Sequence, residues 1–117
     1  MIDNSMEVIK NNEGFEAINS NPSLMRKVVH LDHLMVTIIE FLDGPMENPD
    51  PPHKHVHEQI TYVASGSLKL FIENREYLLN EGDIFKIESN LNHSIQTVTE
   101  YVKLVDSFTP LRQDFIK

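Results

Sequence analysis

The chain has 117 residues, enough for one domain with a single continuous core, and 40% hydrophobic and 24% charged residues are typical of a globular protein. The formal net charge of −8 and the absence of a basic run exclude general binding to nucleic-acid phosphates. No apolar stretch approaches the roughly 20 residues that cross a bilayer, and the lack of cysteine excludes disulfides and thiolate metal sites.

The N-terminal part of the chain, residues 1–23, is expected to form a segment of its own beside a domain of strands that spans residues 24–117. Residues 1–7 contain neither the positive region nor the apolar run of a signal peptide, so we expect a cytoplasmic protein. Residues 5–10 carry a weak helical period, and no longer helical pattern follows.

The rest of the chain is a series of short strand patterns. Runs rich in β-branched residues end at turn pairs such as Asp43-Gly44, Ser65-Gly66 and Gly82-Asp83. Short strands at near-regular spacing are typical of an antiparallel sandwich or barrel, so we expect an all-β domain. The expected strands are residues 27–31, 34–42, 59–63, 67–73, 76–79, 84–87, 94–99 and 102–106.

Histidines at alternate positions follow a proline-rich loop, residues 44–52. The prolines reduce the conformational freedom of the unfolded loop and keep the approach to His53 stiff. Alternate side chains of an extended strand share a face, so His53 and His55 can converge on one point. Neutral imidazole is a common ligand of transition metals, so this pair predicts half of a metal site. His57 has the same parity, but the chain must turn before the next ligand, so we leave it out of the ligand set and expect it either directly behind the ligands or at the rim.

Two residues elsewhere can complete this site. Gln59 lies four residues past His55, and His93 follows the turn at Gly82-Asp83. Glu58 is chemically the stronger ligand, whereas strand parity favours Gln59. The set predicts a mononuclear centre with three imidazoles and one neutral carbonyl oxygen. The expected cofactor is a divalent transition metal, with nickel, zinc, manganese and iron all left open.

The spacing of these residues resembles the first motif of the cupin superfamily of small β-barrels. That motif reads Gly, five residues, His-x-His, three or four residues, a carboxylate or amide ligand, six residues, Gly. His53, His55, Gln59 and Gly66 match it. The leading glycine departs from the pattern, because eight residues separate Gly44 from His53.

The second cupin motif, Gly, five residues, Pro-x-Gly, two residues, His, is also present in its spacing. Gly82 and His93 match it, while Glu88 and Asn90 replace the proline and the second glycine. Asparagine still tolerates a left-handed turn conformation, so the turn is expected to persist. The resemblance covers roughly residues 24–115. It implies a single-domain cupin, an antiparallel jelly-roll β-barrel that binds metal.

The end of the chain resembles the C-terminal signature of the pectin-degradation cupins. Asp106, Phe108 and Arg112 match an Asp-x-Phe-x-x-x-Arg pattern position by position, and the resemblance implies that they are catalytic. Those proteins open the ring of 4,5-unsaturated uronic acids and give linear 4-deoxy-5-keto-uronates. The resemblance therefore implies a metal-dependent enzyme of carbohydrate metabolism with a small acidic sugar as substrate.

These residue types suit that chemistry. A neutral ligand set leaves a divalent ion its full charge, which makes it a strong Lewis acid and attracts an anion. Arg112 offers a planar fork for a carboxylate, Asp106 can move protons, and Phe108 can form an apolar wall. The net charge of −8 works against an anionic substrate, so local positive charge must dominate at the pocket.

Two other classes of function stay open from the sequence. One is a metal-dependent cupin of another reaction class, such as a dioxygenase or an isomerase acting on a small molecule. The other is a non-enzymatic sugar-binding module. In each case we expect a homodimer, because small barrels expose sheet edges and similar cupins commonly pair through N-terminal strands. Residues 15–18 are the expected exchange segment.

Overall fold

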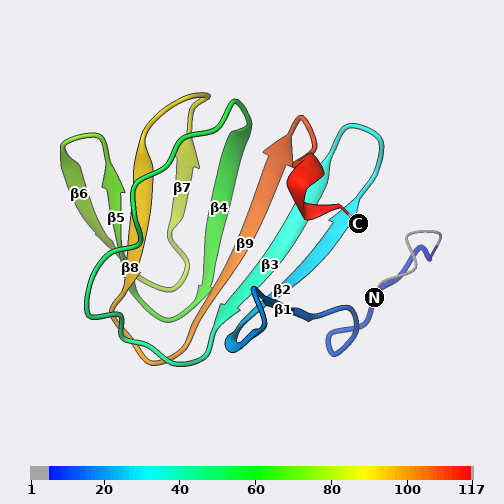
Figure 1. Cartoon of the computed structure of the whole chain (residues 1–117), viewed down its shortest axis with the longest axis horizontal. Coiled ribbons are helices and arrows are strands. Elements are labelled where there is room, and N and C mark those ends of the chain that lie inside the picture. Colours follow the sequence, from blue (N-terminus) through cyan, green and yellow to red (C-terminus); the bar gives the residue numbers. More distant parts are fainter. Residues whose placement is uncertain (1–5, 117) are drawn as a thin grey trace.

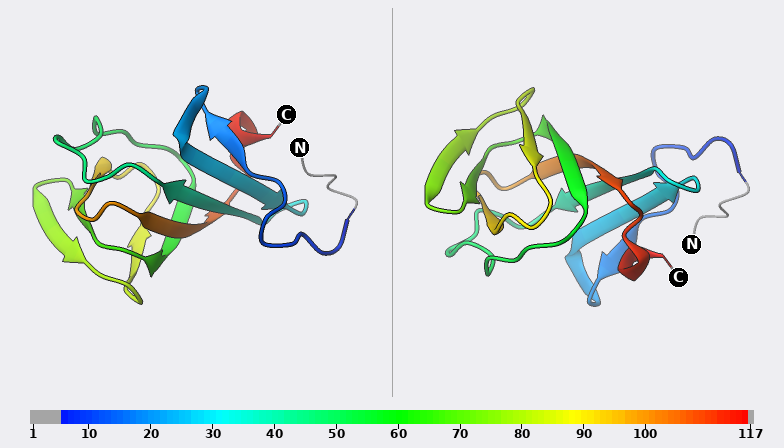
Figure 2. Two further views of the ribbon diagram at one scale, coloured as in Figure 1. Left: turned by 90° about the horizontal axis from the view of Figure 1, so that it is seen from below. Right: turned by 90° about the horizontal axis from the view of Figure 1, so that it is seen from above.

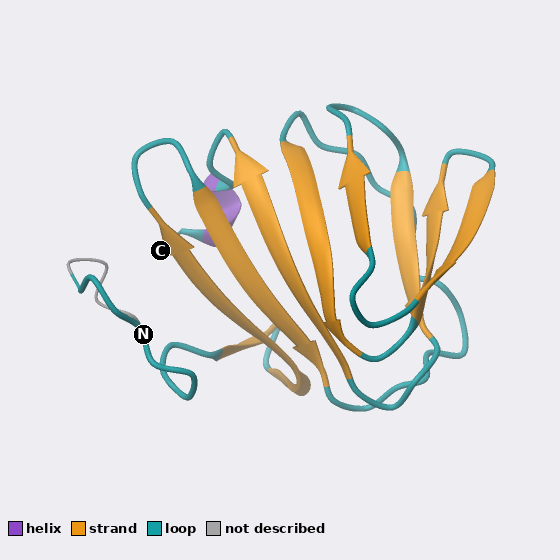
Figure 3. Cartoon of the chain, turned by 180° about the vertical axis from the view of Figure 1, so that it is seen from behind, coloured by secondary structure: helices purple, strands orange, loops and turns teal. Residues whose placement is uncertain are grey.

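The structure, a computed structural model, describes residues 6–116 as an all-β domain with one short 3-10 helix near the C-terminus (Figure 3). No helix within this range is long and apolar enough to cross a membrane. Every strand expected from the sequence overlaps an observed one. The elements are β1 (Glu16–Ile18), β2 (Asn21–His30), β3 (Met35–Phe41), β4 (Glu58–Ser65), β5 (Leu68–Ile72), β6 (Arg75–Leu79), β7 (Ile84–Ile87), β8 (His93–Thr97), β9 (Val102–Thr109) and η1 (Gln113–Phe115).

The strands form two antiparallel sheets that face each other (Figure 1). The larger sheet has the order β1-β2-β3-β9-β4-β7, and the smaller sheet has the order β6-β5-β8. Figure 2 shows β1 and β2 extending the larger sheet beyond the part that faces the smaller one. The predicted fold class, an antiparallel jelly-roll barrel, is confirmed.

Two neighbouring strands of the larger sheet, β9 and β4, alternate between inward-facing and outward-facing residues, and β9 does so along most of its length. Along β9 the buried residues are Val102, Leu104, Asp106 and Phe108, and the residues between them are partly exposed. Alternate side chains of a strand point to opposite faces, so these four face the interior. Val102 and Leu104 lie in the first half of the strand, and Asp106 and Phe108 lie in the second half. β9 thus runs from the apolar core to the expected site residues.

The core consists of two apolar clusters between the sheets. Full burial of a leucine stabilises the fold by roughly 1.5–3 kcal/mol, so Leu68 and Leu70 on β5 are among its main supports. The clusters share the half-buried Leu79 and Ile95, which makes the core continuous. Their buried members are Val63, Leu68, Val102 and Leu104 in one cluster, and Leu70, Ile72, Phe85 and Ile87 in the other.

Two turns explain why the cupin spacing is preserved here. Gly66 has a φ of 81°, and a Cβ at this position would lie 2.1 Å from the carbonyl oxygen of Tyr101. Only glycine fits such a close approach of two backbones. Asn90 has a φ of 65°, the left-handed conformation expected for the residue that replaces glycine in the second motif.

The N-terminal segment packs against its own chain. β1 pairs with β2, and the buried amine of Lys27 donates hydrogen bonds to the carbonyl oxygens of Lys10 and Asn11 at 3.0 and 2.9 Å. Residues 6–10 are not helical, so the weak helical pattern does not lead to a helix there, while residue 5 lies outside the described range. Since β2 begins at Asn21, it crosses the expected boundary between residues 23 and 24. The two-part division and the exchange between subunits stay predictions.

Candidate metal centre

Three histidines from two distant parts of the chain meet at one end of the barrel. His53, in the loop before β4, and His93, the first residue of β8, exchange two backbone hydrogen bonds of 3.0 and 2.9 Å. With His55 they form a cluster in which one ring nitrogen from each lies within 4.8 Å of the others. His53 is exposed, His55 half-buried and His93 buried, so the cluster is open to solvent on the His53 side.

Backbone carbonyls fix the tautomers of two of these rings. Nδ1 of His55 lies 2.9 Å from the carbonyl oxygen of His57, and Nδ1 of His93 lies 2.9 Å from that of Leu91. A carbonyl oxygen only accepts, so Nδ1 carries the hydrogen in each ring and Nε2 keeps its lone pair. Burial lowers the pKa of His55 and lowers the pKa of His93 to about 4. Both rings are therefore neutral near pH 7, as metal ligands must be.

Gln59 faces the same point, whereas Glu58 does not. Gln59 Oε1 lies 3.2 Å from His55 Nε2, while Glu58 is exposed on the other face of β4. With the hydrogen of His55 on Nδ1, the Nε2 lone pair points at an oxygen that also only accepts. A cation between the two atoms would satisfy both, and three imidazole nitrogens with one amide oxygen fit a divalent transition metal. The assignment of the four residues as ligands stays a prediction.

Asp106 lies deep beside this cluster. It is only 4% exposed, and its carboxylate accepts hydrogen bonds from the hydroxyls of Thr61 (2.5 Å) and Thr37 (3.4 Å). The three residues lie directly opposite one another on β3, β9 and β4. Burial raises the pKa of Asp106 to about 6, against the opposing effect of those hydrogen bonds. Near neutral pH both protonation states are therefore accessible, which suits a group that transfers protons.

Phe108 lies beside the three-histidine cluster, and its expected role as an apolar wall stays a prediction. Its ring is buried and meets the rings of His55 and Phe115 edge-on, with centroids 6.1 and 5.9 Å apart. Phe115 comes from η1, the short helix that follows β9. The C-terminal segment thereby helps to bury Phe108.

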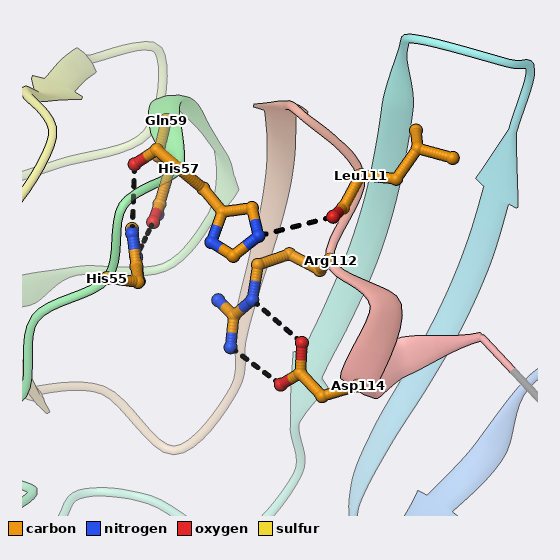
Figure 4. Close-up of polar contacts among 6 residues, drawn as sticks. All are labelled: His55, His57, Gln59, Leu111, Arg112 and Asp114. Carbon is orange, nitrogen blue, oxygen red and sulfur yellow. Dashed lines mark hydrogen bonds and ion pairs between the residues drawn. The ribbon is translucent and has the colours of Figure 1, made fainter.

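Arg112 packs against Phe108 and Phe115, and two of its three guanidinium nitrogens already donate to another residue. Its guanidinium lies over the rings of Phe108 (5.4 Å) and Phe115 (4.2 Å). Nε and Nη2 donate to the two carboxylate oxygens of Asp114 at 3.1 and 2.9 Å. The remaining nitrogen, Nη1, points away from Asp114, toward the side on which His55 and His57 lie (Figure 4).

His57 connects the metal cluster to the C-terminal segment. Its carbonyl oxygen receives the hydrogen of His55 Nδ1, and its own Nε2 lies 3.2 Å from the carbonyl oxygen of Leu111 (Figure 4). It is therefore a link between two segments of the site and lies outside the three-histidine cluster.

The arrangement also includes residues that the sequence did not single out. Thr61 and Thr37 read as ordinary strand formers, because threonine is common in sheets. Asp114 and Phe115 read as part of a tail, although the Arg112 side chain packs on both. In the sequence, the contact between Arg112 and Asp114 is indicated only by their spacing of two residues.

Sequence comparison agrees with this geometry. The cupin domain family matches residues 41–108, which is more than half of the chain and includes all four expected metal ligands. The chain belongs to the cupin family. The resemblance predicted from the two motifs is thus confirmed, and the three-histidine cluster of this cupin occupies the position that both motifs indicate.

Three individual proteins are similar to this cupin over most of its length. The pectin degradation protein KdgF of Dickeya dadantii (strain 3937) is 36% identical over 95 residues, which cover 80% of this cupin and 84% of that protein. The structure of KdgF from Halomonas sp. superposes with a TM-score of 0.79 at 27% identity, covering 92% of this chain and 97% of that one. An RmlC-like cupin from Shewanella frigidimarina NCIMB 400 gives 0.78 at 27% identity, covering 95% and 97%.

Proposed function

We propose that this cupin opens the ring of 4,5-unsaturated uronic acids to give linear 4-deoxy-5-keto-uronates, as a cytoplasmic enzyme of pectin breakdown. The observation that carries the proposal is the placement of Asp106, Phe108 and Arg112 beside the three-histidine cluster. The 36% identity to a pectin degradation protein supports the same substrate class. A small acidic sugar is the partner that this chemistry requires.

The proposed metal ligands are Nε2 of His55 and His93, a ring nitrogen of His53, and Oε1 of Gln59. A divalent nickel, zinc, manganese or iron ion held there supplies a Lewis acid for a sugar oxygen. All four ligands are neutral, so the protein contributes no opposing charge at the centre. The exposed His53 side leaves the approach through which a sugar can enter.

The proposed reaction is an isomerisation with two proton transfers. The bond between C1 and the ring oxygen breaks, the C1 hydroxyl loses its proton and becomes the aldehyde, and the ring oxygen takes up a proton and becomes the hydroxyl of an enol at C5. The enol loses its proton as C4 gains one, which leaves a ketone at C5. Asp106 is the proposed carrier of these protons, because its raised pKa of about 6 lets it accept and return a proton near neutrality.

Arg112 and Phe108 hold the sugar in this scheme. Nη1 of Arg112, the nitrogen not engaged by Asp114, donates to the uronate carboxylate. The guanidinium of Arg26 also lies over the Phe115 ring, at 3.8 Å, so two positive charges gather around one aromatic ring. Asp114 offsets one of these charges, and the other contributes local positive potential that the net charge of −8 opposes. Phe108 lies against the sugar ring and excludes water.

The first test is turnover of an unsaturated uronate. We expect the metal-loaded protein to accelerate loss of the ultraviolet absorbance of unsaturated galacturonate above the spontaneous rate. Because the ring also opens without enzyme, the rate enhancement is the quantity to measure, with chelator-treated protein as the control. No enhancement on any unsaturated uronate would refute the proposal. Oxygen consumption with another substrate would instead indicate a dioxygenase, and tight sugar binding without turnover a binding module.

A second test concerns the carboxylate. We expect Arg112→Ala to raise the apparent KM by about 10- to 100-fold, because a hydrogen bond to a charged group contributes about 1.5–3 kcal/mol. Arg112→Lys keeps the charge without the fork, so it should recover only part of the affinity. Steady-state kinetics on the uronate give both values.

The control for charge is Arg75→Ala, which removes the same charge from an exposed position on β6. Its KM should equal that of the wild type. If Arg112→Ala lowers kcat and leaves KM unchanged, Arg112 does not act as a ground-state anchor for the carboxylate.

A further inference from the structure

A buried threonine stands between the amide of Gln59 and the carboxylate of Asp106. Thr61 Oγ1 lies 2.9 Å from Gln59 Nε2 and 2.5 Å from Asp106 Oδ1, and the residue is fully buried. Gln59 and Thr61 are two residues apart on β4, so their side chains share the inner face of the sheet. On the far side of the amide, Gln59 Oε1 faces His55 Nε2 at 3.2 Å.

The direction of each hydrogen bond in this chain follows from the chemistry of its members. An ionised carboxylate only accepts, so the single hydroxyl hydrogen of Thr61 must go to Asp106. The hydroxyl oxygen then has only lone pairs left for Gln59, and of the two ends of an amide only the NH₂ can donate to it. The amide oxygen is thereby turned to the opposite side, toward the histidines. The two ends of the amide are alike in size and shape, so packing alone does not decide which end faces the histidines.

We propose that Thr61 is a positioning residue that, anchored on Asp106, orients the Gln59 amide so that its oxygen and not its NH₂ faces the metal. The inference rests on the proposed metal centre and concerns how the neutral ligand is kept in a binding orientation. Only the oxygen can coordinate a cation, because the amide NH₂ has no lone pair available to it. A wrongly turned Gln59 would present two hydrogens to the metal.

The fold supplies a matched control in Thr37. Thr37 and Thr61 lie opposite Asp106 on its two neighbouring strands, and both are fully buried. Both hydroxyls donate to the carboxylate, but Thr37 bonds Oδ2 and has no hydrogen bond to Gln59 among the described contacts. Replacing either hydroxyl by a methyl removes the same kind of bond from Asp106. Only the change at Thr61 also removes a hydrogen bond from the amide of Gln59, which keeps its own contact with Asp106 in both variants.

The experiment measures metal affinity in Thr61→Val, Thr61→Ser and Thr37→Val. Zn²⁺ is titrated against a chromophoric chelator at pH 8, where Asp106 is ionised, and Co²⁺ spectra report the ligand set. We expect Thr61→Val to weaken binding by about 10- to 100-fold, the usual effect of removing a group that orients a ligand. Thr61→Ser, which keeps the hydroxyl, and Thr37→Val should stay within a few-fold of the wild type.

The possible outcomes are distinct. Wild-type affinity in Thr61→Val, or equal losses in Thr61→Val and Thr37→Val, would overturn the inference, the latter by tracing the effect to Asp106 alone. Failure of the wild type to bind Zn²⁺, Co²⁺, Ni²⁺, Mn²⁺ and Fe²⁺ alike would instead refute the proposed metal centre. No substrate is used, so the result does not depend on the uronate reaction.

A measurement on the unmodified protein covers the case in which Thr61→Val fails to fold. In Zn²⁺-loaded, ¹⁵N-labelled protein, the side-chain NH₂ of Gln59 should show nuclear Overhauser contacts to Thr61. Contacts from this NH₂ to the ring protons of His55 or His93, with none to Thr61, would show the reverse orientation and reject the proposal.

Discussion

We expect His55→Ala to lose stoichiometric metal, and with it the acceleration of uronate ring opening. His55 is central to the cluster, because Nδ1 is held by the carbonyl oxygen of His57 and Nε2 faces Gln59. Removing the ring takes away one of three imidazoles and the nitrogen that faces Gln59 Oε1. The measurement is elemental analysis after metal loading and desalting, followed by the uronate assay.

His33→Ala is the control for this variant, because His33 is an exposed histidine outside the three-histidine cluster. Its metal content and rate should equal those of the wild type. Full metal content in His55→Ala would show that the cluster is not the metal centre and would remove the basis for the proposed ligands.

Asp106→Asn is expected to reduce kcat/KM by about 10²- to 10⁴-fold at saturating metal, the range typical of a general acid–base group. Asparagine matches aspartate in size, so the interior of the barrel stays filled. What it lacks is the ability to accept a proton. Assays must include enough metal to compensate for weaker binding, because Asp106 also anchors Thr61.

Metal content under the assay conditions decides how the Asp106→Asn result is understood. A slow variant with full metal supports a role in proton transfer. A fully loaded variant that turns over the uronate at the wild-type rate would exclude that role and leave Asp106 only its structural contacts with Thr61 and Thr37.

The sequence predicted most of this arrangement because it depends on the alternation of strand side chains and on turn spacing. Parity alone turns Gln59 inward and Glu58 outward, and it sends Asp106 and Phe108 to the same interior face. Asn90 adopts the left-handed conformation that its position in the second cupin motif predicts. Such features are local, so they can be read from neighbouring positions in the chain.

What the sequence did not predict involves partners that are distant or follow the last strand. Thr61 meets Asp106 only because β4 and β9 pair in one register, and nothing in a single threonine indicates this. The bond between Arg112 and Asp114 depends on how the chain turns after β9. β2 starts at Asn21, six residues before the strand expected from residue 27, and its proline lies near the beginning of the strand, where proline is tolerated.

The change of character along β9 and β4, from apolar residues at one end to polar ones at the other, bears on how this protein could be engineered. Val63, Val102 and Leu104 belong to the packed core, whereas Thr61 and Asp106, one inward step further along the same strands, belong to the site. Free-energy changes at well-separated sites usually add. Substitutions in the part of the core far from the three-histidine cluster can therefore be selected for higher thermal stability. Substitutions around the exposed His53 side of the cluster can be selected separately for other acidic sugars, and the two sets can then be combined.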